Sequence, residues 1–474
     1  MQARRLLRVA TSVAACGRLG GTVHNHNNDE RPGAAELQRG EHTSMPKDTN
    51  HLNRRSVLKA AGAGAAFATV GGLPRVAFAA PKTIKIGLVM PATGPLAFFT
   101  EHVPFTLDQI KKTLGGKIKV NGTEHSYEIV VKDSQSSPNR AAEVTQELIL
   151  KDKVDLVAAF ATPETVNPVS DQCEANGIPC ITNDAPLEPY FFGRKGDPKK
   201  GFEWTYHFFF AGQQLIESLV PYFKRLDTNK KVGALWPNDG DGIAQSDKEH
   251  GNPPFLIKNG FSVIDPGRFD MPASNYNSQI AAFKSAGVEI VTGVVPPPEF
   301  TTFWNGAAQQ GFQPKVVYMG KALEFPPAIT PLGDRALGLT TEVWWSKFHP
   351  YVSGLNGQSS LQLADEYEKV SNRQWSLPLG FRHALFEVIF DVLKRTQNLD
   401  KPESIRDAIK TTDYKSIVGP INFNKGPFPN CALTPLVIGQ WEKGKKYPYE
   451  MVIVDNSTAK DVPVGGDPRV IKYS

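Results

Sequence analysis

Charged and aromatic side chains gather in short loops that directly follow apolar, strand-like runs. The loop "WPNDGDG" supplies Trp236 and Asp239, and the loop "MGKALEF" supplies Lys321. In open parallel sheets, ligands bind beyond the carboxyl ends of the strands. We therefore expect these loops to form part of a binding site for a small molecule.

The same arrangement occurs earlier in the chain. After "VDLVAAF", the loop "ATPET" places Thr162 and Glu164 at the start of a predicted helix, and "TNDAP" places Asn183 and Asp184 after the next strand. Unpaired N–H groups at a helix N-terminus suit a ligand carboxylate. Thr162 could instead be a plain helix N-cap, and the two roles are compatible.

The sequence contains no familiar enzyme motif. It has no P-loop, no GxSxG elbow and no HExxH. The segment "GDGIAQSDKE" lacks the spacing of a calcium loop, and the cysteines lack zinc-site spacing. We predict a protein that is not an enzyme and has no metal and no cofactor. The alternative is a hydrolase whose triad assembles in space around His383, which has no evident Ser or Cys partner in the sequence.

Cys173 and Cys180 flank the segment "EANGIP". They could form a small-loop disulfide, as in an exported protein, or remain two buried thiols.

Strands and helices alternate along most of the chain. Strands predicted at 83–91, 125–134, 154–160 and 178–182 are separated by helices at 102–114, 137–152 and 163–177. This order indicates a doubly wound parallel sheet. A second series, from a helix at 213–226 to a strand at 315–320, repeats it. We therefore predict an α/β fold with two such blocks, followed by amphipathic helices and short strands.

The segment "LNRRSVLKAAGAGAAFATVGG" has the layout of an export signal. It is too short and too weakly apolar to span a membrane, and Ala77-Phe78-Ala79 provides a cleavage site. Arg54 and Arg55, with Leu58 and Lys59, resemble the twin-arginine export motif. We expect 1–79 to be a leader, with 45–79 as the signal, translation starting at Met45 and 1–44 a misassigned extension. The alternative is a buried helix.

The predicted mature chain is nearly neutral. Removing the 11 basic and 5 acidic residues of 1–79 from totals of 53 and 48 leaves 42 and 43. A net charge of −1 gives no electrostatic reason to bind nucleic acid.

An ordered set of segments resembles one known family. "IKIGLVMPATGPLA", "DSQSSPNRAAEVTQELILKDKVDLVAAF", "NPVSDQCEANGIPCI", "AAFKSAGVEIVTG" and "VGPINFNKG" followed by "VIGQWEKGKKYP" are similar to the branched-chain-amino-acid type of periplasmic solute-binding proteins. The likeness covers nearly all of 82–456. It implies a monomeric periplasmic receptor that closes on a small-molecule ligand and delivers it to an ABC permease of the inner membrane. A sensor that signals to a membrane receptor is the nearest alternative.

The resemblance also implies an architecture and a site. The type I fold has two lobes joined by several strands, here expected at 82–206 plus 337–425 and at 207–336 plus 426–474. The expected ligand-binding residues come from loops after strands and from one later helix. They are Phe98, Phe99, Thr162, Glu164, Asn183, Asp184, Trp236, Asp239, Glu299, Lys321 and Phe381.

Two of these loops depart from the family pattern. Amino-acid binders place an acidic residue directly after "MG", where this chain has Lys321, and their Ser/Thr-rich loop is altered to Thr162-Pro163-Glu164. A buried lysine would disfavour a ligand ammonium and favour an anion. We therefore slightly favour an amine-free, aromatic acid over an amino acid as the ligand. The alternative is that Lys321 points into solvent.

Overall fold

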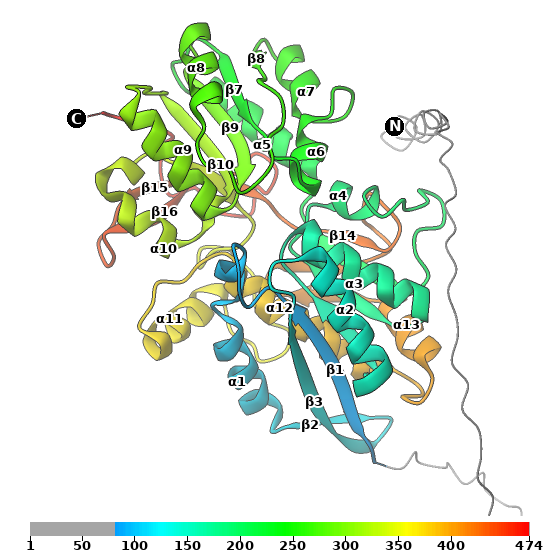
Figure 1. Cartoon of the computed structure of the whole chain (residues 1–474). Helices are drawn as coiled ribbons and strands as arrows, with labels where there is room; N and C mark the ends of the chain where they lie inside the picture. The colour runs from blue at the N-terminus through cyan, green and yellow to red at the C-terminus, as the bar shows by residue number, and fades with distance from the viewer. Residues whose placement is uncertain (1–80, 474) are drawn as a thin grey trace, which may run out of the picture. The chain divides into compact units, whose positions relative to one another are not determined.

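The computed structural model describes residues 81–473, which form two seven-stranded sheets and one two-stranded hairpin (Figure 1). The predicted leader at 1–79, including its signal and the start at Met45, lies outside this range. Within the described range, no helix combines the length and the apolar character needed to cross a membrane.

The first sheet has the strand order β14-β6-β5-β4-β1-β3-β2. Its neighbours pair in parallel, except that β2 runs antiparallel to β3. The central strand β4 is buried at every position, as expected for a parallel strand covered on both faces. The bounds are β1 (Thr83–Met90), β2 (Lys117–Val120), β3 (Thr123–Asp133), β4 (Leu156–Ala159), β5 (Cys180–Asn183), β6 (Thr205–Phe209) and β14 (Cys431–Leu433).

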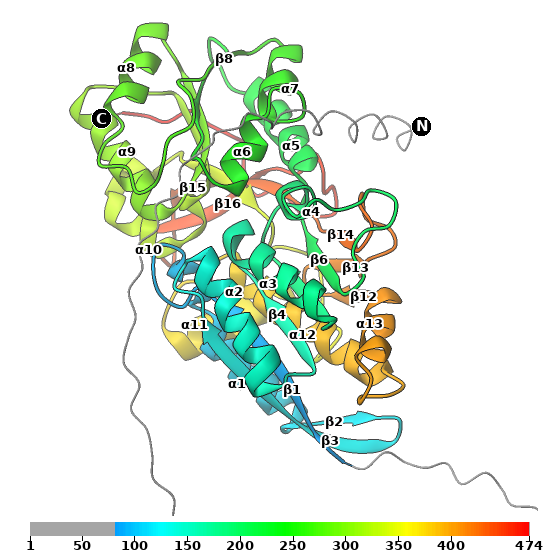
Figure 2. The ribbon, with the colours of Figure 1, turned by 45° about the vertical axis from the view of Figure 1, so that its right-hand side comes forward.

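Helices cover both faces of this sheet. α1 (Val103–Leu114) packs with α12 (Pro378–Arg395) on one face, and α2 (Pro138–Glu147) packs with α3 (Thr162–Asn176) on the other (Figure 2). The Ser137 hydroxyl accepts the Arg140 N–H at 3.4 Å, and Pro138 stands at the first position of α2. The predicted helix at 137–152 consists of α2 followed by the π-helical turn η4 (Leu148–Asp152).

The second sheet has the order β16-β15-β11-β10-β9-β7-β8, and only β15 runs against its neighbours. α5 and α7 cover one face, and α8 and α9 cover the other. The strands are β7 (Lys231–Leu235), β8 (Ser262–Ile264), β9 (Ile290–Val295), β10 (Val316–Lys321), β11 (Thr340–Val343), β15 (Val437–Lys443) and β16 (Tyr449–Asp455). The helices are α5 (Gly212–Lys224), α6 (Gly240–Ser246), α7 (Asn252–Lys258), α8 (Asn277–Ala286) and α9 (Pro297–Gln309).

The other elements are short or lie at the rim of a sheet. They are η3 (Ala97–Thr100), α4 (Leu187–Phe191), η5 (Ala322–Glu324), α10 (Pro326–Ile329), η6 (Thr330–Ala336), α11 (Ser360–Ser371), α13 (Pro402–Lys410) and the hairpin β12 (Asp413–Ser416) with β13 (Gly419–Asn422). The predicted α/β class and the two predicted blocks are confirmed.

We call the parts around the first and second sheets lobe 1 and lobe 2. The chain passes between them after β6, after β11 and after β14, at 209–211, 344–346 and 434–436. The boundaries expected at 206, 336 and 425 fall several residues earlier. They cut β6, place β11 in lobe 1 and place β14 in lobe 2, whereas β11 pairs with β10 and β14 pairs with β6. Apolar strands of this kind can pair in either sheet, so only the strand pairing in the structure shows where the lobe boundaries lie.

Cys173 and Cys180 are buried free thiols in the structure. Of the two alternatives, the disulfide is therefore not observed. Cys173 lies on α3 and Cys180 begins β5, where the helix packs on the sheet. Burial first, and then the Cys180 thiol, raises the pKa of Cys173 well above its usual range.

Candidate functional site

The backbone is strained at the loops that follow three strands. The φ angles are 73° at Ala161, 64° at Thr162, 61° at Asp184 and 62° at Lys321. These residues lie at the ends of β4, β5 and β10, and none is a glycine. Left-handed backbone is rare for other residues, especially for a β-branched one such as Thr162. Such strain concentrates at functional sites, so these loops mark the candidate site.

On the lobe 1 side, a buried ion pair occupies the ends of β4 and β5. Asp184 pairs with Arg382 of α12, and both side chains are inaccessible to solvent. The Arg382 guanidinium carbon lies 3.5 Å from the centre of the Phe160 ring. The Asp184 carbonyl accepts the Thr162 N–H at 2.7 Å, and the Asn183 amide donates to the Phe381 carbonyl at 3.1 Å. Two strand ends and one helix are thereby joined in one polar cluster.

Thr162 is the first residue of α3, and its side chain does not cap the helix. The N-cap position belongs to Ala161, which has no side chain able to accept a hydrogen bond. The Thr162 hydroxyl is buried and has no partner among the described residues. The plain N-cap interpretation of Thr162 is therefore not observed, and its hydroxyl is available for another partner.

On the lobe 2 side, Lys321 lies among three carboxylates. Its Nζ is 2.6 Å from Asp241 Oδ2, 3.1 Å from Asp239 Oδ2 and 4.0 Å from Glu164 Oε2. Only 6% of Lys321 is exposed, so it does not point into solvent. Burial opposes its charge, but the carboxylates outweigh burial and raise the pKa of Lys321 well above its usual range.

The acidic partners change the electrostatic argument for the ligand. Burial, and then Glu164 and Asp239, raise the pKa of Asp241 to about 7, although Lys321 lowers it. One lysine facing three acids leaves no free positive charge for an anion. The inference that Lys321 favours an anionic ligand is therefore not supported, because the sequence could not show that Asp239, Asp241 and Glu164 converge on it.

Direct contacts join the two lobes at these strand ends. Glu164 of α3 accepts the Gly240 N–H of α6 at 3.0 Å, in addition to its contact with Lys321. The rings of Phe98 and Phe99 in η3 lie 5.6 Å and 4.9 Å from the ring of Phe325, which follows η5. The carboxyl ends of both sheets thus face each other, with an aromatic contact beside a charged one.

The remaining predicted residues occupy different positions. Trp236 is buried beside Ala234 and Val294 at the end of β7, and its indole N–H has no partner among the described residues. Glu299 accepts the Tyr276 hydroxyl inside lobe 2 and does not join the charged cluster. Phe381 packs between the lobes, where its ring lies 5.1 Å from that of Phe209 and 4.9 Å from that of Trp344.

Sequence reasoning missed several charged residues near the site. Arg382 and Glu342 were absent from the expected set, although each interrupts an apolar run, "LPLGFRHALFEVIF" and "LTTEVWW". Glu342 accepts the Tyr318 hydroxyl at 2.6 Å, and Glu324 accepts the Trp344 indole N–H at 3.3 Å. Burial raises the pKa of both carboxyls, and Glu342 raises that of Glu324 further. A charge inside an apolar run was the available signal.

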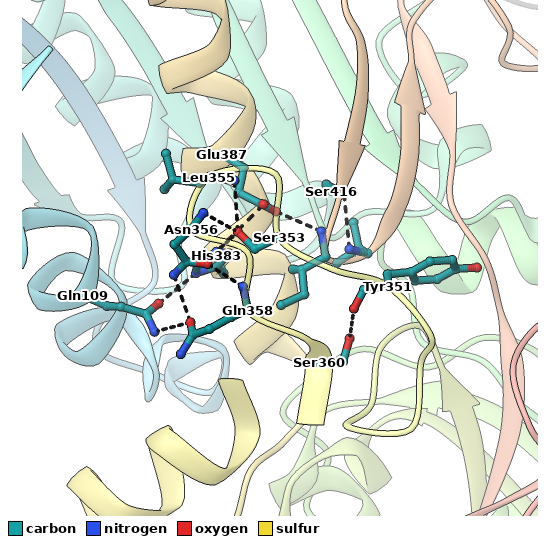
Figure 3. Close-up of polar contacts among 12 residues, drawn as sticks. Gln109, Tyr351, Ser353, Leu355, Asn356, Gln358, Ser360, His383, Glu387 and Ser416 are labelled. Atoms are coloured by element: carbon teal, nitrogen blue, oxygen red, sulfur yellow. Dashed lines mark hydrogen bonds and ion pairs between the residues drawn. The ribbon is translucent and has the colours of Figure 1, made fainter. Parts of the chain in front are cut away.

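The structure supplies a serine partner for His383 that the sequence did not reveal (Figure 3). The Ser353 hydroxyl lies 2.9 Å from His383 Nε2, and Gln109 Oε1 lies 2.9 Å from His383 Nδ1. The Ser353 oxygen also accepts the N–H groups of Leu355 and Asn356 at 3.2 Å and 3.3 Å. Burial lowers the pKa of His383 to about 4. The serine therefore fixes a turn within a buried network that joins α1, α12 and the loop before α11.

One surface cavity lies away from these loops. It has a volume of about 610 Å³ and borders β6 and α13, with Tyr206, Arg406 and Phe428 in its wall. Among residues 81–473, no group of three or more His, Cys, Asp or Glu is arranged to hold a metal ion.

Comparison with known proteins gives the family. Residues 83–446 match the family described as periplasmic binding protein. The chain belongs to this family. The resemblance seen in the sequence is confirmed, and the family is one of substrate-binding receptors.

Individual relatives are distant. The chain is 26% identical over 233 residues to a Leu/Ile/Val-binding protein homolog of Brucella melitensis, covering 48% of this chain and 57% of that protein. The match thus spans little more than half the length of that relative.

Solved structures share the type I fold. A solute-binding protein of an ABC transporter from Rhodopseudomonas palustris, in complex with 3,4-dihydroxybenzoic acid, has a TM-score of 0.62 and 20% identity, covering 79% of this chain and 98% of that one. A branched-chain amino acid transporter substrate-binding protein of Streptococcus pneumoniae, in complex with isoleucine, has a TM-score of 0.61 and 19% identity, covering 78% and 99%. The fold prediction is confirmed.

Proposed function

We propose that this protein is the periplasmic receptor of an ABC importer and captures a small carboxylate-bearing solute between its lobes. The observation that carries the proposal is the meeting of Glu164 and Gly240 across the strand ends of both sheets. A solute held there touches both lobes, so its binding free energy favours the closed state. The closed form would then dock on a permease of the inner membrane, and export would use the twin-arginine pathway.

The two sides of the site suit different ends of a solute. Lobe 1 offers Arg382 and the start of α3, which are attractive to a carboxylate. Lobe 2 offers Asp239 and Asp241, whose oxygens accept hydrogen bonds from an ammonium or from hydroxyl groups. The solute should therefore carry a carboxylate at one end and a hydrogen-bond donor at the other.

Two chemical classes meet this requirement. Hydroxylated aromatic acids come first, because the Phe98, Phe99 and Phe325 rings provide an apolar surface beside the charged groups. An amino acid is the second candidate, because the carboxylates around Lys321 give that cluster a net negative charge that suits an ammonium. Structural relatives in complex with 3,4-dihydroxybenzoic acid and with isoleucine represent both classes.

Thermal unfolding and calorimetry with a small panel test the proposal. The panel contains 4-hydroxybenzoate, 3,4-dihydroxybenzoate and isoleucine, each with the primary amide in which a neutral carboxamide replaces the carboxylate. At a concentration 100-fold above its Kd, the correct acid should stabilise the protein by about 2.7 kcal/mol, and its amide should not. Equal stabilisation by acid and amide, or no stabilisation by any acid, would refute the proposal.

A further inference from the structure

Arg382 is a buried cation with unused hydrogen-bonding capacity. Its Nε donates to the Pro378 carbonyl of its own helix at 3.3 Å, and its charge is paired with Asp184. Neither terminal nitrogen makes a hydrogen bond of normal geometry to another described residue. A guanidinium has five N–H donors in a planar fork, so the contact with one carboxylate leaves donors free.

Other buried polar atoms without partners surround this pair. Within the described residues they include the Thr162 hydroxyl and the Asn183 and Asp184 Oδ1 atoms. Buried polar atoms in folded proteins are nearly always hydrogen-bonded, and an unsatisfied one destabilises the fold. Their concentration at the ends of β4 and β5, where Thr162 and Asp184 also have left-handed backbone, indicates a ligand position and not an ordinary core.

The surroundings hold the guanidinium in a fixed orientation. The Phe160 ring lies against its face at 3.5 Å, and Asp184 occupies part of its edge. Arginine recognises carboxylates through two parallel N–H···O bonds, which a fixed fork forms at little entropic cost. Asp184 neutralises the charge of Arg382. Further attraction for a ligand carboxylate comes from the partial positive charges at the N-termini of α3 and α12, which begin at Thr162 and Pro378.

We propose that Arg382 binds the carboxylate of the transported solute and that Asp184 is the positioning residue for its guanidinium. The inference rests on the proposed function, which it deepens by naming the group that selects an acid. The Thr162 hydroxyl lies in the same cluster and can donate to the same carboxylate. The opposite end of the solute is then directed towards the acids around Lys321.

Arg194 provides a matched control. It is also a buried arginine of lobe 1, paired with Asp171 at 2.7 Å and stacked on Phe202 at 3.9 Å. Unlike Arg382, it donates to the Thr205 hydroxyl at 3.0 Å, at the amino end of β6 and thus away from the site. Arg194→Met should reduce stability and leave ligand affinity unchanged.

The test is calorimetric titration of the exported protein with 4-hydroxybenzoate, isoleucine and their amides. Arg382→Met and Arg382→Lys should weaken binding of the acid by about 10- to 100-fold, as for a lost hydrogen bond to a charged group, and should reduce the preference for acid over amide. Folded variants of Arg382 that keep the wild-type affinity for the acid would overturn the inference and leave the proposed function intact. A wild-type protein that binds none of the probes would overturn both.

A second measurement does not depend on the folding of a variant. In NMR spectra of the wild-type protein labelled with ¹⁵N-arginine, the Arg382 Nε–H signal should shift on addition of the acid and not of the amide. Arg194 should show no shift with either probe. An Arg382 signal that does not shift when the acid binds would reject the inference, and the binding itself would still support the proposed function.

Discussion

Replacement of Lys321 by Met tests the charged cluster between the lobes. The substitution keeps most of the side-chain volume and removes the cation that lies 2.6 Å from Asp241 and 3.1 Å from Asp239. Removal of one partner from a buried ion pair typically costs about 3–5 kcal/mol, because the remaining charge is uncompensated. Three carboxylates lose their common cation here, so we expect a loss of that size in the free energy of unfolding at pH 8.

The loss should depend on pH in a defined direction. Without Lys321, the effect that lowers the pKa of the buried Asp241 carboxyl is lost, so burial and the neighbouring carboxylates raise that pKa further in the folded protein. A raised folded-state pKa destabilises the fold above the unfolded pKa, where the unfolded chain has released the proton. The penalty is therefore largest at pH 8, shrinks as the pH falls through the raised pKa, and disappears below the unfolded-state pKa of about 3.9, where both states hold the proton.

Urea unfolding followed by tryptophan fluorescence, at pH 8 and pH 5, measures both effects. Lys443→Met is the control, because Lys443 pairs with Asp334 at 2.6 Å but is largely exposed, and it should leave the unfolding free energy unchanged. A loss below about 1 kcal/mol for Lys321→Met at pH 8, the size of an exposed ion pair, would refute the cluster as described. An equal loss at both pH values would also refute it.

Four further substitutions, one of them a control, test other parts of the structure. Burial raises the pKa of Glu387 to about 7 from 4.5. Its contribution to the unfolding free energy should therefore fall by about 3 kcal/mol between pH 4.5 and 7. In urea titrations, Glu387→Gln should abolish that fall. Gly380→Ala places a methyl group 2.3 Å from Trp345 and should lower the unfolding free energy by about 1–3 kcal/mol in the same assay. Gly306→Ala, also within a helix but near only a flexible side chain at 3.2 Å, should be neutral or stabilising, and equal effects of the two alanines would contradict the packing. Glu164→Gln should weaken binding of the preferred acid about tenfold in calorimetry, because the variant loses the contact with Lys321 between the lobes. An unchanged affinity would show that this contact does not contribute to closure on the ligand.

Much of the fold could be predicted because its elements carry local signals. Ser137 and Pro138 mark the start of α2, and Gly177, with a φ of 67°, ends α3. The strand β6 was missed, because its run "TYHFF" contains a histidine and lies beyond the regular alternation. It lies between β5, the preceding strand of the chain, and β14, which comes from a distant segment.

The position of the site remains a prediction from the sequence, and its charge pairings could not be predicted. The loops after β4, β5 and β10 were expected from topology, and their left-handed backbone supports that choice. The partners of Lys321 and Asp184 were not expected, because they belong to segments more than 75 residues apart in the sequence. Sequence alone shows which charges exist, and tertiary structure decides which of them neutralise one another.

Small-angle X-ray scattering, with and without the preferred acid, tests the central claim most directly. If the lobes close on a carboxylate at the facing strand ends, saturating acid should reduce the radius of gyration, the matching amide should have no effect, and the acid should be recovered unchanged. Identical scattering curves with and without a bound acid, or chemical conversion of that acid, would contradict the account.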